Sequence, residues 1–286
     1  MAYASFCELL SAAAIAGSLG EAVISLEVEE SGAPREEVLA RLEASLSVME
    51  DAVARGLAGE ARSRSGMTGG DARLVVQKGP CLAGETFSDA VAGALAVAEV
   101  NAAMGRIVAA PTGGASGVLP GVLLAVASRL SAPCESVVLA LAASGGIGAI
   151  IAAKATLSGA AGGCQAEIGS AAAMAAAAAV ELAGGTPEQA GHAASLALQG
   201  QMGLVCDPIG GLVEIPCVVR NATGAAVALA AAEMALSGVT FPVPLDEVIS
   251  AMGSVGRSLP PSLRETALGG LATTPTGKRL AKGAAG

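Results

Sequence analysis

The sequence predicts an all-α fold, a multi-helix body rich in alanine and glycine with few or no strands. Apolar residues recur at spacings of three and four in several long segments, whereas alternating apolar and polar runs are almost absent. Hydrophobic residues make up 53% of the 286 residues, yet aromatic residues make up only 1%. Such a core cannot depend on aromatic bulk, so we expect helices that approach one another closely through alanine and glycine.

A long helix near the N-terminus has a clear pattern. Pro34 suits its first turn and Gly56 its end. Between them lie apolar residues at helical spacing: Val38, Leu42, Leu46, Met49 and Val53. The polar, glycine-rich residues 60–80 are expected to form a connection. We therefore expect N-terminal helices over residues 1–62 that pack on a main helical body over residues 63–286, the two forming one continuous domain.

Further helical segments follow along the chain. Thr186 begins a well-marked one, because a threonine cap, Pro187 at the first helical position and Gln189 three residues after the cap form a start signal. The tail from Pro260 is mixed in character and is expected to be loose at its end. The other helices expected from periodicity are residues 86–108, 118–130, 135–153, 165–183, 218–237 and 244–256.

Charge and hydropathy limit the partners of the chain. The formal net charge is −9 without a lysine and arginine cluster, which argues against nucleic acid and against an anionic membrane surface. The best candidate for a membrane span, residues 136–153, has only eighteen uncharged residues and is split by Gly145 and Gly146, so a core helix is favoured. The N-terminus has no basic residue before its apolar stretch, and Glu8 interrupts that stretch. These features argue against a signal peptide and predict a cytoplasmic protein.

Nucleotide and zinc signatures do not fit the sequence. Residues 145–150 have Gly-x-Gly without a third glycine, and residues 274–279 lack the upstream glycine and the Ser/Thr of a phosphate-binding loop. No Cys-x-x-Cys pair occurs, and His192 is the sole histidine, which argues against a zinc site and a Ser-His-Asp triad. We interpret His192 as an ordinary residue of the helix that begins near Pro187.

Two glycine-rich turns offer hydroxyl groups and unencumbered backbone amides. They are "SGMTGGDA" (65–72) and "APTGGASGVLPG" (110–121), and the second directly precedes a helix. Glycine lets backbone amides approach an anion, and a helix N-terminus favours negative charge, so either turn could hold a carboxylate. Two tight turns between helices would give the same pattern. Both readings stay open at this point.

Cysteine placement separates the six thiols into two groups. Cys164 follows flexible glycines and precedes a long helix, and Cys217 begins the helix after Pro216, so the helix dipole favours a thiolate at both. Cys206 lies on the loop between them, and Asn221 projects from the same helical face as Cys217. We interpret Cys7 and Cys134 as small packing residues and leave Cys81 undecided. On local pattern alone, three buried inert cysteines remain as plausible as three ligands.

Several long motifs, in order, carry a family resemblance. They are "SGMTGGDA", "EVNAAMGRIVAAPTGGASGVLPGVL", "GCQAEIGSAAAMAAAAAVELAGGTPEQ", "GLVCDPIGGLVEIPCVVRNATGA" and "TPTGKRL". On these segments the chain resembles the alpha chain of bacterial iron–sulfur-dependent L-serine dehydratases (L-serine ammonia-lyases). The resemblance implies a helical catalytic body and a separate beta chain, assembled as a higher oligomer of alpha–beta pairs. It also implies a [4Fe–4S] cluster with one open iron, held by Cys164, Cys206 and Cys217.

The resemblance further implies a reaction. Three ligands leave one iron open to bind the serine hydroxyl as a Lewis acid, and loss of water leads to pyruvate and ammonia. No general base is identifiable in the sequence, and we expect the beta chain to supply it. The residues expected around this small amino-acid substrate are Ser65, Thr68, Gly69, Gly70, Thr112, Gly113, Gly114, Lys154 and Asn221.

Departures from the family pattern leave alternatives open. Ala161 and Gly162 stand where the family often has Glu-Val, and Gln199–Gln201, with Gly200 at the centre, stands where it often has Glu-His-Asn. A reshaped pocket could suit a related iron–sulfur lyase that acts on L-threonine or L-cysteine. A pyridoxal phosphate dehydratase that uses Lys154 is a second alternative. A third is a non-enzymatic membrane or scaffold subunit.

Overall fold

The computed structural model describes residues 3–284, and within that range it is built from helices without strands. The expected all-α class is confirmed, and an isolated parallel bridge pairs Cys206 with Arg264. The elements are α1 (Phe6–Ala16), α2 (Leu19–Ser31), α3 (Arg35–Leu57), α4 (Asp71–Lys78), α5 (Glu85–Ala102), α6 (Val118–Leu130), α7 (Cys134–Lys154), α8 (Gly159–Gly162), η1 (Gln165–Gly169), α9 (Ser170–Leu182), α10 (Pro187–Gly200), η2 (Ile209–Gly211), α11 (Cys217–Leu236), α12 (Leu245–Ser258), η3 (Pro261–Leu263), η4 (Gly270–Thr273) and α13 (Pro275–Ala284).

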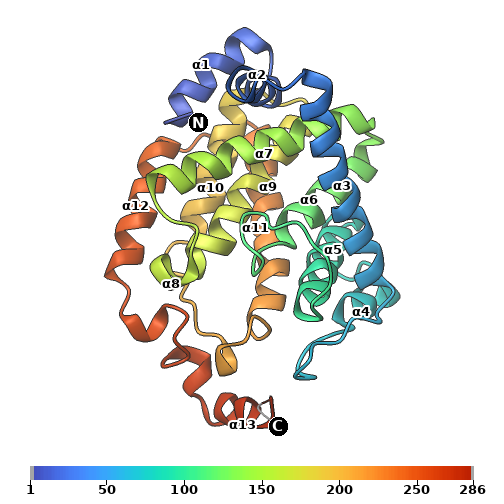
Figure 1. Cartoon of the computed structure of the whole chain (residues 1–286), viewed down its shortest axis with the longest axis vertical. Coiled ribbons are helices and arrows are strands. Elements are labelled where there is room, and N and C mark those ends of the chain that lie inside the picture. Colours follow the sequence, from blue (N-terminus) through green and yellow to red (C-terminus); the bar gives the residue numbers. More distant parts are fainter. Residues whose placement is uncertain (1–2, 285–286) are drawn as a thin grey trace.

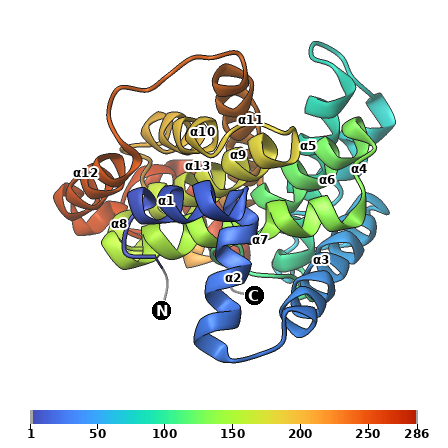
Figure 2. The ribbon, with the colours of Figure 1, turned by 90° about the horizontal axis from the view of Figure 1, so that it is seen from above.

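Helix α9 forms the centre of the molecule. It packs against α6, α7, α10 and α11, and all its residues from Ser170 to Val180 are buried. Eight of the thirteen residues in its segment "SAAAMAAAAAVEL" are alanine. Small side chains let four neighbours approach one axis. Figures 1 and 2 show α3–α6 on one side of this centre, α12 on the other, and α1 and α2 across one end.

Glycine makes the closest helix contacts possible. A Cβ placed on Gly121 of α6 would lie 2.6 Å from the carbonyl oxygen of Ala90 on α5. Real Cβ atoms do not come so near to a backbone atom, so α5 and α6 pack at this distance only because residue 121 has no side chain. This contact confirms the expectation that alanine and glycine, rather than aromatic bulk, bring the helices together.

Several expected helix ends are confirmed, because their signals are local. Helix α6 spans residues 118–130 as predicted, and α3 begins directly after Pro34. At the start of α10, the Thr186 side chain accepts a hydrogen bond from the Gln189 amide, and the Gln189 side chain accepts one from the Thr186 amide. These reciprocal bonds form a capping box, with Pro187 at the first helical position.

Three expectations about elements were wrong. Residues 60–80 are not a plain connection, because Asp71–Lys78 forms α4, whose Asp71 and Ala72 amides donate to Glu99 Oε1. The helix expected over residues 86–108 ends at Ala102, followed by Met104 in the left-handed region with φ 62°. The tail is not loose up to residue 284, because Thr274 Oγ1 accepts from the Gly277 amide and begins α13. Residues 285–286 lie outside the described part.

The expected helix over residues 165–183 divides in two. Gln165–Gly169 forms a π-helical turn, and α9 follows from Ser170. The Gln165 side chain holds this turn, because its Nε2 donates to the Gly162 and Met252 carbonyls and its Oε1 accepts from the Gly203 amide. Such turns recur at functional sites, and this one begins directly after Cys164.

The apolar helix α7 is a core helix by its burial. By length and composition it could cross a membrane, and 67% of its apolar window is buried within the molecule. Helices α1 and α2 would pass the same test together, but the chain bends by 97° between them. The burial of α7 agrees with the core-helix interpretation of residues 136–153.

Candidate functional site

Burial separates the six cysteines as the sequence could not. Cys164, Cys206 and Cys217 are buried, with 2%, 3% and 9% of their surface exposed. Cys7 and Cys134 were expected to be packing residues, and this was wrong: both are exposed because they stand in first turns that face outward. The three buried thiols are free of disulfides. They come from three segments: the turn before η1, the loop after α10 and the first residue of α11.

The buried thiols influence one another electrostatically. Burial raises the pKa of Cys164 to about 11, and Glu167 adds to that rise whereas the positive charge of Arg220 opposes it. Burial, followed by the charge of Cys164, raises the pKa of Cys217 to about 12 and raises that of Cys206 as well. Thiols in this state are protonated at neutral pH, so binding of a cation would release their protons.

The three thiols do not converge on one point. Among residues 3–284, no three His, Cys, Asp or Glu side chains are placed to hold a single metal ion. In a [4Fe–4S] cluster each cysteine binds a different iron atom, so its ligands surround a volume instead of a point. The electrostatic influence of the three sulfurs on one another fits that wider arrangement.

The side chain of Glu167, on the π-helical turn, lies near the Cys206 thiol. A Cβ on Gly159 would lie 2.6 Å from Glu167 Oε2 and 3.1 Å from Cys206 Sγ, so the carboxylate and the thiol approach the glycine from the same side. Burial raises the pKa of Glu167, and a hydrogen bond from Thr112 opposes the rise. A protonated or easily protonated carboxyl group beside a thiol is suited to proton transfer.

Both glycine-rich turns are connected to the cysteine segments. Thr112 Oγ1 donates to Glu167 Oε1 at 2.7 Å, which joins the 110–121 turn to the segment after Cys164. Ser65 Oγ donates to Glu214 Oε2, which joins the 65–72 turn to the loop before Cys217. The structure therefore connects Ser65 and Thr112, two of the residues expected around the substrate, to the cysteine segments. Gly114 takes part as well, since a Cβ there would lie 3.3 Å from Glu167 Oε1.

The amides of the first turn already bind a carboxylate of the protein. Glu99 is fully buried, and its Oε1 accepts from the amides of Asp71 and Ala72, directly after Gly69 and Gly70. Burial raises the pKa of Glu99, and the amide hydrogen bonds from this turn oppose the rise. Thr68 Oγ1 is buried and has no hydrogen-bond partner within the described residues. The turn thus offers hydroxyl groups more than free amides.

Asn221 has a structural role. Its Oδ1 accepts from the Gly117 amide at 2.8 Å, and its Nδ2 donates to the carbonyls of Gly114 and Cys217 at 2.7 and 2.9 Å. The side chain is fully buried. These three bonds hold the 110–121 turn against the start of α11, next to Cys217.

Lys154 and His192 have partners elsewhere. Lys154 Nζ lies 3.4 Å from Asp246 Oδ1, and Asp246 also accepts from the Phe6 amide at the start of α1. His192 Nδ1 accepts from the Phe241 amide at 3.3 Å, as suits an ordinary helical residue. Within the described chain, neither residue forms a hydrogen bond or an ion pair with the three buried cysteines.

Residues that the sequence interpretation missed complete the site. Arg220 bonds to Asp207 at 2.8 Å, beside Cys206. Asn101 faces Gly113, since a Cβ on that glycine would lie 3.6 Å from Asn101 Oδ1, and its side chain makes no hydrogen bond within residues 3–284. One signal for Glu167 was present: it is the single charged residue between Lys154 and Glu181. An isolated charge in an apolar run is a functional candidate.

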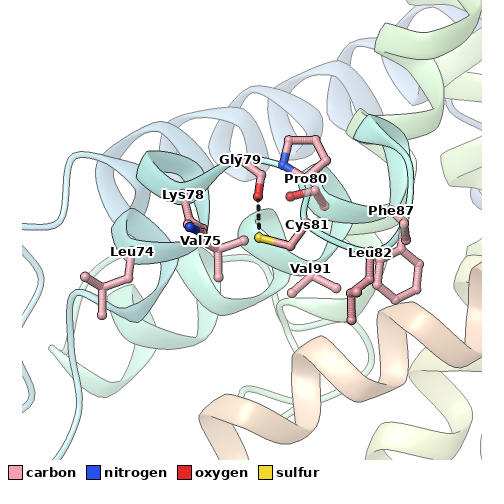
Figure 3. Close-up of a pocket in the computed structure, with 11 residues that line it drawn as sticks. Leu74, Val75, Lys78, Gly79, Pro80, Cys81, Leu82, Phe87 and Val91 are labelled. Atoms are coloured by element: carbon pink, nitrogen blue, oxygen red, sulfur yellow. Dashed lines mark hydrogen bonds between the residues drawn. The ribbon is translucent and has the colours of Figure 1, made fainter.

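A separate hollow lies between α4 and α5. It has a volume of about 400 Å³ and is lined mainly by apolar side chains, including Leu74, Leu82 and Phe87 (Figure 3). Cys81, which the sequence left undecided, lies in this hollow, and its Sγ donates to the Gly79 carbonyl at 3.4 Å. The lining holds no convergent polar groups, so this hollow does not resemble the cysteine site.

The fold and the site first define a class: a helical protein with three free, buried thiols on segments that also carry Glu167, Asp207 and Arg220. A family model described as the serine dehydratase alpha chain matches residues 16–272, and the chain belongs to this family. The chain is 50% identical to the probable L-serine dehydratase, alpha chain, of Bacillus subtilis (strain 168), over 92% of this chain and 89% of that protein. It is 44% identical to the L-serine dehydratase, alpha chain, of Peptoniphilus asaccharolyticus, over 90% and 89%.

Longer relatives match a smaller part. The L-serine dehydratase of Streptomyces coelicolor is 47% identical over 63% of this chain, and the match covers 40% of that protein.

Proposed function

We propose that this chain, together with a separate beta chain, eliminates water from L-serine to give pyruvate and ammonia. The observation that carries the proposal is that Cys164, Cys206 and Cys217 are all buried, with Glu167 Oε2 and Cys206 Sγ on the same side of Gly159. Its relatives from Bacillus and Peptoniphilus are named as alpha chains of L-serine dehydratase, which supports the same activity here. The reaction class is that of a carbon–oxygen lyase.

The three buried cysteines would hold a [4Fe–4S] cluster. Two features fit such a group: Gly159 leaves the space beside Cys206 free of a side chain, and the buried Arg264 Nε, in the segment paired with Cys206, has no partner among the described residues. When bound, a cluster with three cysteine ligands supplies an open iron that acts as a Lewis acid toward a hydroxyl group.

The residues of this chain would bind the substrate and handle protons. Thr112 Oγ1 orients Glu167, whose Oε2 would carry the proton that the leaving hydroxyl takes up as water. Thr68 Oγ1 and the side-chain amide of Asn101 form no hydrogen bond within residues 3–284. Both would therefore be available to the substrate carboxylate. Ser65, Gly113 and Gly114 would shape the same wall. Asn221 would keep this wall in place.

The beta chain would complete the site. The names of the two alpha-chain relatives imply a second chain, and we propose that it supplies the base that removes the α-proton. The product after loss of water is an aminoacrylate, which tautomerises and is hydrolysed to pyruvate and ammonia. The match with the Streptomyces protein covers 40% of its length, which leaves room there for such a part within one chain. A cytoplasmic assembly of several alpha–beta pairs is the proposed form.

Anaerobic co-purification with a candidate beta chain tests the proposal. We expect a brown, oxygen-sensitive protein with about four iron atoms per alpha chain, which releases pyruvate from L-serine. Substitution of Cys164, Cys206 or Cys217 by serine should lower the iron content and abolish activity, because each removes one thiolate ligand. Cys7→Ser and Cys134→Ser are matched controls that should change neither quantity, since both thiols are exposed.

The same assay separates the alternatives. Turnover of L-threonine or L-cysteine without turnover of L-serine would assign the site to a related lyase. A yellow, iron-free protein would point to pyridoxal phosphate and contradict the cluster. Equal loss of iron in all five cysteine variants would show that the ligands are wrongly assigned.

A further inference from the structure

The guanidinium group of Arg220 joins the segments that carry the three buried cysteines. Its Nη1 donates to the Val205 carbonyl at 2.8 Å, and its Nη2 donates to Asp207 Oδ1 at 2.8 Å. These two acceptors flank Cys206 in the chain. Arg220 itself lies on α11, three residues after Cys217, so one side chain links the second and third cysteine segments.

The same group also faces the first cysteine. Arg220 lies beside the Cys164 thiol, and its positive charge acts on Cys164 and on Cys217. Its side chain is only 14% exposed, and that of its partner Asp207 only 4%. A pair buried this deeply is screened little by solvent, so its geometry and charge act strongly on nearby groups.

Apart from Arg220, the charged side chains that act on the pKa values of the thiols are acidic. The carboxylates of Glu167 and Glu265 both act on Cys206 and Cys217. The other arginine near this loop, Arg264, contacts the Ala161 carbonyl at 3.5 Å, at the limit of a hydrogen bond. Three buried thiolates beside acidic side chains are stabilised by a positive charge close by, and Arg220 is placed to provide it.

We propose that Arg220 is a positioning residue that holds the three cysteine segments in one arrangement and supplies the positive charge that a thiolate-bound cluster requires there. This inference rests on the proposed function. Arginine suits both tasks, because its planar guanidinium offers several donors in a fixed geometry and stays charged. Lysine would retain the charge but could not hold Val205 and Asp207 in the same way.

The test compares Arg220→Gln and Arg220→Lys with the wild-type chain, each purified anaerobically with the beta chain. Two quantities are measured: the rate at which an iron chelator removes the cluster, and the midpoint potential of the cluster. We expect Arg220→Gln to lose its cluster about 10-fold faster or more and to show a more negative potential, because a nearby positive charge is gone. Arg220→Lys should lose it faster too, with a potential close to wild type.

Arg35→Gln is the matched control. Arg35 forms an ion pair with Glu21 at the same 2.8 Å distance, on helices that carry none of the three buried cysteines. This variant should leave both measurements unchanged. Circular dichroism of the apo-proteins shows whether each variant folds. If Arg220→Gln does not fold, the test depends on Arg220→Lys: faster cluster loss than in the wild type supports the inference, and an unchanged rate contradicts it.

Failure of this inference can be distinguished from failure of the proposed function. A wild-type complex that contains iron, with Arg220 variants that match it in cluster lifetime and potential, would overturn this inference alone. A wild-type complex without iron would overturn the proposed function and this inference together.

Discussion

A single buried amide at position 221 holds two distant segments of the chain together. Asn221 makes three hydrogen bonds, all with backbone groups, and these groups belong to Gly114, Gly117 and Cys217. With the side chain removed, two carbonyl groups and one amide would lose these bonds in a buried place. Such groups are costly because neither protein nor water replaces the bond.

Asn221→Ala should therefore lower the free energy of unfolding by about 2–4 kcal/mol. Asn101→Ala is the matched control: its side chain, close to the same turn, makes no hydrogen bond within the described residues, and its loss should cost less than about 1 kcal/mol. Urea denaturation of the apo-chain measures both. Similar losses in the two variants would show that the three bonds contribute little.

At the scale of elements, glycine decides how close two helices can come. Helix α6 approaches α5 at Gly121, where an added Cβ would meet the backbone of Ala90 and Ala94. Gly145 lies inside α7 on an exposed surface, and an added Cβ there meets nothing within 4 Å. The same residue type thus serves packing at one position and only weakens a helix at the other.

These two glycines make a matched pair of opposite predictions. Gly121→Ala should destabilise the protein by about 1–3 kcal/mol, because α5 and α6 must move apart. Gly145→Ala should stabilise it by up to about 1 kcal/mol, because alanine favours a helix. Thermal and urea unfolding of both variants measure the change. Destabilisation by Gly145→Ala would show that the outer surface of α7 is covered in the assembled protein.

For the molecule as a whole, the N-terminal helices share the largest core cluster with the body. Phe6, Leu9 and Leu19 belong to the same cluster as Ile147 of α7 and Met252 of α12. Asp246 of α12 adds a polar link, because its carboxylate accepts from the Phe6 amide and pairs with Lys154. These contacts support our proposal that residues 1–286 form one continuous domain.

One domain should unfold in one step. We expect a single calorimetric transition for the apo-chain, with the same midpoint by circular dichroism. Leu9→Ala should shift this single transition to a lower temperature. It leaves a cavity in the shared core, which lowers the free energy of unfolding by about 2–5 kcal/mol. Two separate transitions, with Leu9→Ala affecting only the weaker one, would instead divide the chain near residue 62.

Local signals account for the parts of the fold that could be predicted. The bounds of α6 and the capping box of α10 follow from residues within one or two helical turns. Helix α4 was missed because the acceptor for its first amides is Glu99, 28 residues away from Asp71. The end of α5 was misplaced because apolar residues continue past Ala102 and hide the left-handed Met104.

The sequence by itself determined the all-α class, the small-residue core and, through its motifs, the family. Periodicity and caps act between neighbours in the chain, so they can be read without a structure. Only the tertiary structure decided which cysteines are buried, that Glu167 and Arg220 stand beside them, and that Lys154 pairs with Asp246. The reason is physical: burial and charge depend on which segments meet in space, and Thr112 and Glu167, which bond to each other in this site, are 55 residues apart in the chain.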